Sequence, residues 1–165
     1  MSYATNTSVP ESRSREELQF VLEKFGADQF MYTNDRVTNS AVIGFRYKGA
    51  HFIFRLPLAT DKDKAVRFTP AGKLRPNGDI ATRVAQENRR RWRSLALTIK
   101  AMLIGVEDGI FNFAQVFMPY MVWGDGRTTW EALLPVAEEC CRQGRPMVNL
   151  SMCLPAPEDK EQHRG

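Results

Sequence analysis

The segment 79–108 constrains the fold of this chain more than any other part of the sequence, because its apolar residues recur at helical spacing over its whole length. At about 100° per residue, one stripe of that helix is mostly apolar and the opposite side is cationic. The apolar stripe contains Val84, Asn88, Trp92, Leu95, Ile99, Met102 and Val106. The cationic side contains Arg83, Arg89, Arg90, Arg93 and Lys100. We therefore predict one long helix, with Asp79 as its N-cap and Gly109 after its last turn.

The composition is that of a small globular protein with a mild basic bias. The chain has 165 residues, 43% of them hydrophobic, which suffices for one core. Its net charge is only +4, so any partner has to be inferred from where the charges lie. We predict a flexible lead over 1–13, a single α+β domain over 14–154 that includes a basic loop at 58–78, and a disordered tail over 155–165.

Three strands are predicted in the first half of the chain, at 30–33, 41–47 and 50–56. The last two flank the turn Lys48-Gly49, and alternate residues within them are apolar, as in a hairpin with one buried face. The apolar face contains Ile43, Phe45, Tyr47, Phe52, Phe54 and Leu56. The opposite face presents Arg46, His51, Ile53 and Arg55. These strands form an antiparallel meander with one apolar and one partly cationic face.

A short amphipathic helix is predicted before the strands, over 14–25. Ser14 and Glu17 have the spacing of a capping box, and Gly26 supplies a left-handed stop. The segment between the strands and the long helix, 58–78, has no periodicity and is rich in glycine, proline and lysine or arginine. A loop of this length in a small domain is usually either functional or disordered.

Two shorter helices are predicted after the long one. Asn112 is a candidate N-cap for the first, which Pro119 should shorten or kink. A capping box at Thr128 opens the second, which runs to about Gln143 and ends at Gly144. The fold class is therefore α+β: a three-stranded antiparallel meander packed against an N-terminal helix, one long helix and two shorter C-terminal helices.

No reaction is indicated by the sequence, so we expect a protein that is not an enzyme and that needs no metal and no cofactor. His51 and His163 are the only histidines, and fingerprints of hydrolases, nucleotide-binding loops and dinucleotide folds are missing. A metal-dependent nuclease is a third-ranked alternative, because Asp61 and Asp63 place carboxylates beside lysines; a solvated loop explains them better.

The cysteines and the start of the chain lead us to expect a cytoplasmic protein that does not enter membranes. Cys140, Cys141 and Cys153 are odd in number and follow no signal peptide, so we expect reduced thiols. Their role is expected to be structural, as that of buried cysteines usually is. No apolar run reaches the length needed to span a bilayer.

Nucleic acid, DNA or RNA, is the leading candidate partner. Several arginines and lysines could neutralise phosphates as one field. These candidate binding residues are Arg89, Arg90, Arg93, Lys100, Arg46, Arg55, Lys73 and Arg75. Trp92 lies on the apolar stripe, which favours a core role over base stacking. The alternative for the arginines is an ordinary solvated helix in which Glu87 pairs with Arg91 at i, i+4.

Protein–protein interaction is the alternative function, because the last third of the chain is rich in aromatic residues and methionine. Such residues occur both in cores and in interfaces. The candidate interface residues are Phe117, Tyr120, Met121, Trp123 and Trp130. The partner would be another protein or a second copy of the chain in a homo-oligomer.

The second half of the chain resembles small uncharacterised accessory proteins of bacteriophages and mobile elements. The resemblance lies in residues 88–97, 99–103, 109–110 and 125–128, together with Trp130. It implies no known activity and no catalytic residue. It does imply a context, the cytoplasm of a bacterial host, where accessory proteins of this kind commonly handle nucleic acid or block a host or defence factor.

Overall fold

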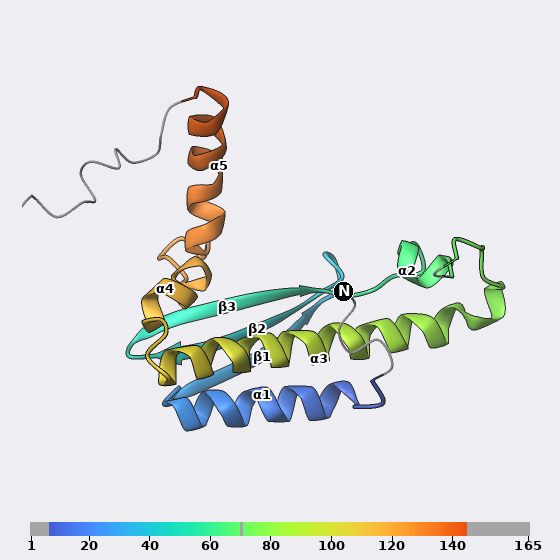
Figure 1. The fold of residues 1–165 in the computed structure, drawn as a ribbon, viewed down its shortest axis with the longest axis horizontal. Helices are drawn as coiled ribbons and strands as arrows, with labels where there is room; N and C mark the ends of the chain where they lie inside the picture. The colour runs from blue at the N-terminus through green and yellow to red at the C-terminus, as the bar shows by residue number, and fades with distance from the viewer. Residues whose placement is uncertain (1–6, 70, 145–165) are drawn as a thin grey trace, which may run out of the picture. The chain divides into compact units, whose positions relative to one another are not determined.

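The computed structural model describes residues 7–69 and 71–144, which include all the helices and strands named below. The fold is α+β, as the sequence predicts (Figure 1). In chain order the elements are α1 (Glu11–Phe25), β1 (Gln29–Asp35), β2 (Ser40–Tyr47), β3 (Ala50–Pro57), α2 (Lys64–Arg67), the 3₁₀ turn η1 (Asn77–Asp79), α3 (Ile80–Glu107), α4 (Phe113–Phe117), the 3₁₀ turn η2 (Met118–Tyr120) and α5 (Thr129–Arg142).

The chain divides after Thr129 into two compact units, where the sequence predicts one domain over 14–154. The first unit contains the sheet and every helix from α1 to α4. Helix α5 is the only element among the described residues of the second unit, and none of its apolar side chains is buried. A lone helix has no partner element with which to form a core, and residues 130–144, the described part of the second unit, contain no buried apolar side chain.

The sheet is an antiparallel meander in the order β1-β2-β3. Phe45 of β2 lies opposite Phe30 of β1 and Phe52 of β3, so the three side chains point to one face. The β2–β3 turn places Lys48 at φ 49° and Gly49 at φ 80°, the left-handed pair that a tight two-residue hairpin needs. The predicted hairpin and its apolar face are therefore confirmed.

Helices α1 and α3 run side by side across the apolar face of the sheet (Figure 1). Trp92 and Ile99 of α3 are completely buried there, together with Phe117 of α4. Tyr32 packs edge-on against Trp92, with ring centroids 5.4 Å apart. The predicted core role of Trp92 is confirmed. Each such side chain contributes about 1.5–3 kcal/mol by leaving water, which fixes α3 on the sheet.

Helix α1 begins at Glu11, three residues before the predicted start, so the capping box at Ser14 is wrong. Pro10 is the N-cap, and the Ser14 N–H donates to its carbonyl at 3.2 Å, which places Ser14 inside the first turn. The Ser14 side chain is buried and cannot cap. The fixed φ of proline suits the start of a helix, so Pro10 is an alternative to Ser14 as the N-cap. The predicted stop at Gly26 is confirmed by its φ of 107°.

The ends of α3 also differ in one respect from the prediction. Asp79 precedes the helix, but its side chain makes no capping hydrogen bond because η1 leads into α3 with Asp79 already in a helical conformation. At the other end Gly109 has φ 71°, and the Ile110 N–H donates to the Gly105 carbonyl at 2.9 Å, as expected for a glycine stop.

The C-terminal predictions hold where they can be compared. Asn112 and Gln115 form a reciprocal capping box at 2.8 Å in each direction. Helix α4 ends at Phe117, and Pro119 lies in the 3₁₀ turn that follows, so the proline shortens the helix. Gly144 has φ 64° directly after the last turn of α5. The predicted disordered tail 155–165 lies outside the described residues.

The basic loop contains more structure than predicted. Helix α2 places Val66 in a buried position, and the Arg75 N–H donates to the Arg67 carbonyl at 2.8 Å, which closes the segment on itself. Short-range hydrogen bonds of this kind leave no hydrophobic periodicity in the sequence. Over the described helices, none combines the length and the apolar character that a membrane crossing requires.

Candidate nucleic-acid interface

Most cations on the predicted cationic side of α3 are held by carboxylates. Arg93 and Lys100 of α3 both bind Glu17 of α1, Lys100 at 3.5 Å. The hydrogen bond from Arg93 holds the pKa of Glu17 below its ordinary value, with a smaller contribution from Lys100. These two ion pairs join α1 to α3. The two cations are therefore partly neutralised, and the prediction that they belong to an open field is wrong for them.

Glu87 neutralises the next pair of arginines along the helix. Arg90 binds it with two hydrogen bonds at 2.6 and 2.8 Å, and Arg91 adds a third at 3.2 Å. These bonds, first of all those from Arg90, lower the pKa of Glu87, and Glu87 raises the pKa of Arg90. Arg91 also binds Asp63 and the Pro57 carbonyl, at 3.0 Å to the latter. The predicted Glu87–Arg91 pair is confirmed.

Arg46 and Arg55 lie on the sheet face that points away from α3. Their strand neighbours Phe45 and Phe54 face the core, so the alternation of the strand places the two arginines on the other side. Arg46 is held by Asp28 through two hydrogen bonds of 2.8 Å, which lower the pKa of Asp28. The expectation of one field that joins sheet and helix arginines is therefore wrong.

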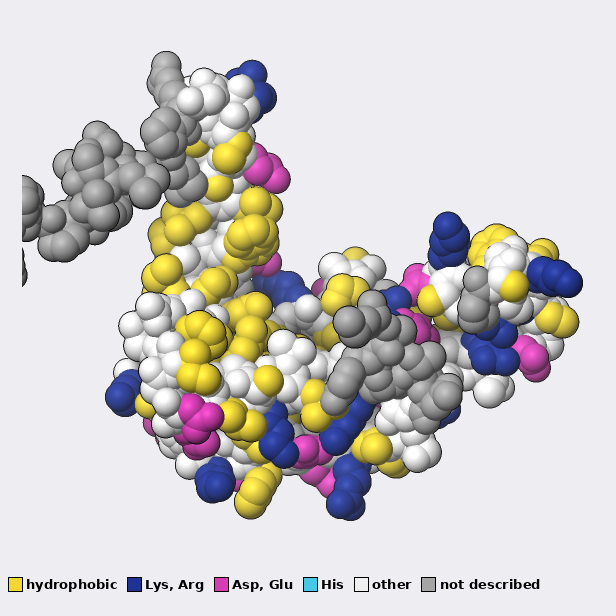
Figure 2. All heavy atoms as spheres, in the orientation of Figure 1, with side chains coloured by type: hydrophobic (Ala, Val, Ile, Leu, Met, Phe, Trp, Pro, Cys, Tyr) yellow, Lys and Arg dark blue, Asp and Glu magenta, His cyan; other side chains and the backbone are white. Residues whose placement is uncertain are grey.

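A groove of 1710 Å³ opens between the segment at Thr7–Glu11, the loop that includes α2, and the first turns of α3. Its walls hold five basic side chains and three acidic ones. The basic side chains are Lys64, Arg75, Arg83, Arg89 and Arg90. The acidic side chains are Glu11, Asp79 and Glu87. We call this site the basic groove; Figure 2 shows Lys and Arg side chains around α2 and the facing end of α3.

Three of the groove cations, Arg75, Arg83 and Arg89, are held differently from Arg90, Arg93 and Lys100. Arg89 donates to the neutral amide oxygen of Gln86 at 2.6 and 3.2 Å, so it keeps its charge, and Gln86 in turn donates to the Thr7 carbonyl at 3.0 Å. Arg75 donates to the Phe68 carbonyl at 3.0 Å. Arg83 is exposed and, within the described part of the chain, has no acidic partner. Backbone and amide partners orient a guanidinium without cancelling its charge.

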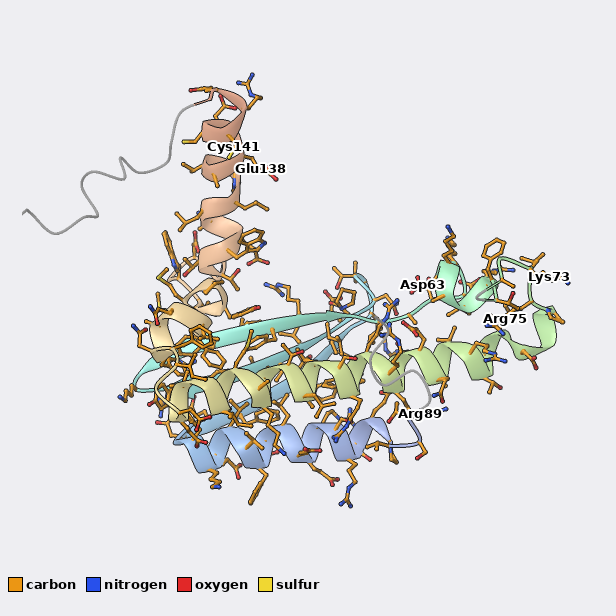
Figure 3. All side chains as sticks on the ribbon, in the orientation of Figure 1. Asp63, Lys73, Arg75, Arg89, Glu138 and Cys141 are labelled. Atoms are coloured by element: carbon orange, nitrogen blue, oxygen red, sulfur yellow. The ribbon has the colours of Figure 1, made fainter. Side chains whose placement is uncertain are left out.

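Three of the eight predicted binding residues line the basic groove: Arg75, Arg89 and Arg90. In Figure 3, Arg75 comes from the loop before α3 and Arg89 from α3 itself. Lys73 lies in the same loop as Arg75 but is not among the lining residues. The prediction therefore identifies part of this site, whereas its other five residues lie outside the groove.

Lys64, Phe68 and Arg83 also line the groove but are not among the predicted binding residues. Phe68 is 38% exposed at the end of α2 and is the aromatic side chain of the groove walls. An exposed aromatic ring beside cations is the arrangement on which nucleic-acid bases stack. Its only signal in the sequence is an aromatic residue within the basic loop.

The carboxylates of the nuclease alternative are engaged elsewhere. Asp61 lies 3.6 Å from Arg67, and Asp63 binds Arg91. Across residues 7–69 and 71–144, no three side chains of metal-ligating type lie together. Cys140 is half-buried and Cys141 exposed, so neither has the buried position expected for a structural cysteine; Cys153 lies outside the described residues.

The predicted interface residues separate into core and surface. Phe117 is fully buried, so its assignment to an interface is wrong. Tyr120 stacks on Phe54 with centroids 4.0 Å apart, and Met121 forms a bridge with β3, so both belong to the edge of the core. Trp123 is 42% and Trp130 58% exposed, and these two remain candidates.

Comparison with known proteins adds no assignment. No protein-family model, no curated protein and no solved structure matches the chain. The resemblance to phage accessory proteins stays a prediction, and a function has to be argued from the site itself.

Proposed function

We propose that this chain binds nucleic acid in the basic groove, as a non-enzymatic accessory protein of the phage type that its second half resembles. The observation that carries the proposal is the convergence of Lys64, Arg75, Arg83 and Arg89 from two segments on one groove, beside Phe68. The four cations neutralise phosphates, and the released counterions supply most of the affinity. Phe68 offers a base a stacking surface.

The groove is a better candidate than the cations outside it because most groove cations do not have to break an ion pair first. Arg93 and Lys100 would have to leave Glu17, and Arg46 would have to leave Asp28. The free energy needed to separate such a pair offsets much of the free energy that a phosphate contact contributes. Arg89 exchanges only a neutral amide partner. Arg90 is the exception within the groove because Glu87 holds it.

Two triple variants of equal charge test this assignment. Arg75→Ala/Arg83→Ala/Arg89→Ala removes groove cations, whereas Arg46→Ala/Arg93→Ala/Lys100→Ala removes paired cations outside the groove. Each lowers the net charge by three, from +4 to +1. The groove variant should bind a fluorescent oligonucleotide on the order of 50-fold more weakly at low salt, with a log–log salt slope shallower by about 2–3. The control should lose no more than a few-fold.

The measurement is fluorescence anisotropy at several salt concentrations, with single- and double-stranded DNA and RNA, after circular dichroism has shown that both variants are folded. Equal losses in the two variants would mean that only bulk charge matters, and the groove would be rejected. No binding by the wild-type chain at low salt would reject nucleic acid as the ligand.

A second candidate function, protein–protein interaction, is favoured by the exposed Trp123 and Trp130. Trp123 is held by a hydrogen bond from its ring nitrogen to the Thr129 hydroxyl at 2.9 Å and is 42% exposed. Trp130 opens α5, whose apolar side chains are not buried. This candidate predicts a complex that resists salt, the opposite of the behaviour expected for the basic groove.

A further inference from the structure

The basic groove is larger than a pocket for one small molecule. Its volume of 1710 Å³ exceeds the roughly 300–1,000 Å³ of pockets that enclose drug-sized ligands. Its lining residues come from three stretches of the same compact unit, within 7–11, 64–75 and 79–90. The groove therefore suits an extended ligand that crosses several segments of the chain.

The charges of the groove walls are mixed. The basic side chains exceed the acidic ones by only two, because Glu11, Asp79 and Glu87 also line the groove. These carboxylates weaken the attraction for a phosphate backbone, since like charges repel at short range. A ligand that offers the groove further contacts besides its phosphates is therefore favoured.

Phe68 supplies such a contact, because its backbone is fixed while its side chain is 38% exposed. Its N–H donates to the Lys64 carbonyl at 3.0 Å, and its carbonyl accepts from the Arg75 guanidinium at 3.0 Å. Phe68 and Leu74 also form an antiparallel backbone bridge. An anchored backbone reduces the conformational freedom that the ring loses when a planar group stacks on it.

The hydrogen bond from Arg75 to the Phe68 carbonyl places a cation and an aromatic ring at one point of the groove. Arg75 keeps its charge there, since a carbonyl does not neutralise it. A nucleotide has the matching pair of groups, because a planar base and a charged phosphate adjoin in every unit of the chain. A base on Phe68 and a neighbouring phosphate at Arg75 therefore use both groups together.

The accessibility of the bases distinguishes a single strand from a duplex. In a duplex each base is stacked on its neighbours, and proteins read the open edges with a helix or a pair of strands that enters a groove of the nucleic acid. Here the cations and the ring line a hollow in the protein. A single strand can turn its base faces toward Phe68, and Thr69 and Thr82 in the groove lining offer hydroxyls to base edges.

We propose that the ligand of the basic groove is single-stranded nucleic acid, with a base stacked on Phe68 and phosphates at Arg75, Arg83 and Arg89. This inference rests on the proposed function, because it names the form of nucleic acid that the same site takes. Stacking on an aromatic ring tolerates every base, so we expect little dependence on sequence. Strands of DNA and of RNA share this chemistry.

Fluorescent probes of equal length, about 12 units, separate the contribution of bases from that of phosphates. They are a thymidine strand, a uridine strand, an abasic strand with the same phosphates but no bases, and a duplex of mixed sequence. Anisotropy titrations at about 0.15 M salt should show the thymidine and uridine strands bound about tenfold more tightly than the abasic strand and the duplex. Only the first two offer free base faces to Phe68.

Substitutions at Phe68 test whether its ring makes this difference. Phe68→Ala should bind the thymidine strand no more tightly than the abasic strand, and its affinity for the abasic strand and the duplex should equal that of the wild type. Phe68→Trp keeps a stacking surface and should retain the preference for single strands. Leu74→Ala truncates an exposed apolar side chain of the same loop that does not line the groove, and this control should behave like the wild type.

The possible results separate this inference from the proposed function. Equal binding of the thymidine and abasic strands, or tighter binding of the duplex, would overturn the single-strand inference and leave nucleic-acid binding intact. The same holds if folded Phe68→Ala keeps the preference, or if Phe68→Trp or Leu74→Ala loses it. If the wild-type chain binds none of the probes at any salt concentration, both proposals are overturned.

Discussion

The two ends of helix α3 carry the same kind of residue in different electrostatic settings. From the middle of the helix onward, Arg93 and Lys100 share Glu17 and hold α1 in place. Near its N-terminus, Arg83 is exposed, and among the described residues Arg89 binds the amide of Gln86 and no carboxylate. The density of arginine in the sequence is therefore a poor guide to binding. What decides is whether a carboxylate, on the same helix or on another element, lies within reach.

Between Arg89 and Arg93, Arg91 has a third role, because it holds the backbone segment that leaves β3. Arg91 binds Asp63, Glu87 and the Pro57 carbonyl. Beside it the Ala59 N–H donates to Asn88 at 2.6 Å. These contacts fix the segment that leaves β3 onto α3 and so set the position of the loop that forms one wall of the basic groove.

The largest effect on stability should come from Arg91. Arg91→Ala removes bonds to two carboxylates and one carbonyl, all partly shielded from water, and should cost about 2–3 kcal/mol of unfolding free energy. Arg83→Ala should cost less than about 0.5 kcal/mol because its side chain is exposed. Urea denaturation monitored by circular dichroism measures both. Equal losses of unfolding free energy in the two variants would mean that Arg91 holds the fold no more than the exposed groove arginine Arg83 does.

A smaller effect, on binding alone, should come from Phe68. Phe68→Ala should weaken binding of a single-stranded oligonucleotide about tenfold and leave the salt slope unchanged, because it removes stacking and no charge. Phe20→Ala, an exposed phenylalanine on α1, is the matched control. Anisotropy titrations at two salt concentrations measure the effect. A changed slope, or an equal loss in the control, would mean that Phe68 does not stack on bases.

The fold was predictable from the sequence wherever apolar residues recur at helix or strand spacing, because that spacing shows which side chains are buried. Trp92 and Ile99 on the α3 stripe, and Phe45 and Phe52 in the hairpin, take the positions that their spacing predicts. The start of α1 was not predictable in this way because two entry signals, Pro10 and Ser14, lie close together. Only packing, which buries Ser14, decides between them.

The candidate site was predictable only in part because charge pairing is a tertiary property. Glu87 and Arg91 are four residues apart, and that pair can be read from helical spacing. Glu17 and Arg93 are far apart in sequence, and only the packing of α1 on α3 reveals their contact. Phe68 joins the groove through local turns of the basic loop, which leave no pattern in the sequence.

The smallest of these effects should appear at acid pH and concerns the pair that joins α1 to α3. Because the pKa of Glu17 is lower in the folded chain than in the unfolded chain, its contribution is present above the ordinary value of 4.5 and is lost as the pH falls through the folded value. Glu17→Gln should therefore lower stability at pH 7 by up to about 1 kcal/mol and weaken the dependence of stability on pH below about 5. Glu16→Gln, an exposed neighbour on α1, is the control, and thermal unfolding between pH 3 and 7 gives both curves. If the two variants have the same pH dependence, Arg93 and Lys100 are not held by Glu17 in solution. The C-terminal half of α3 would then expose the same kind of cations as the basic groove.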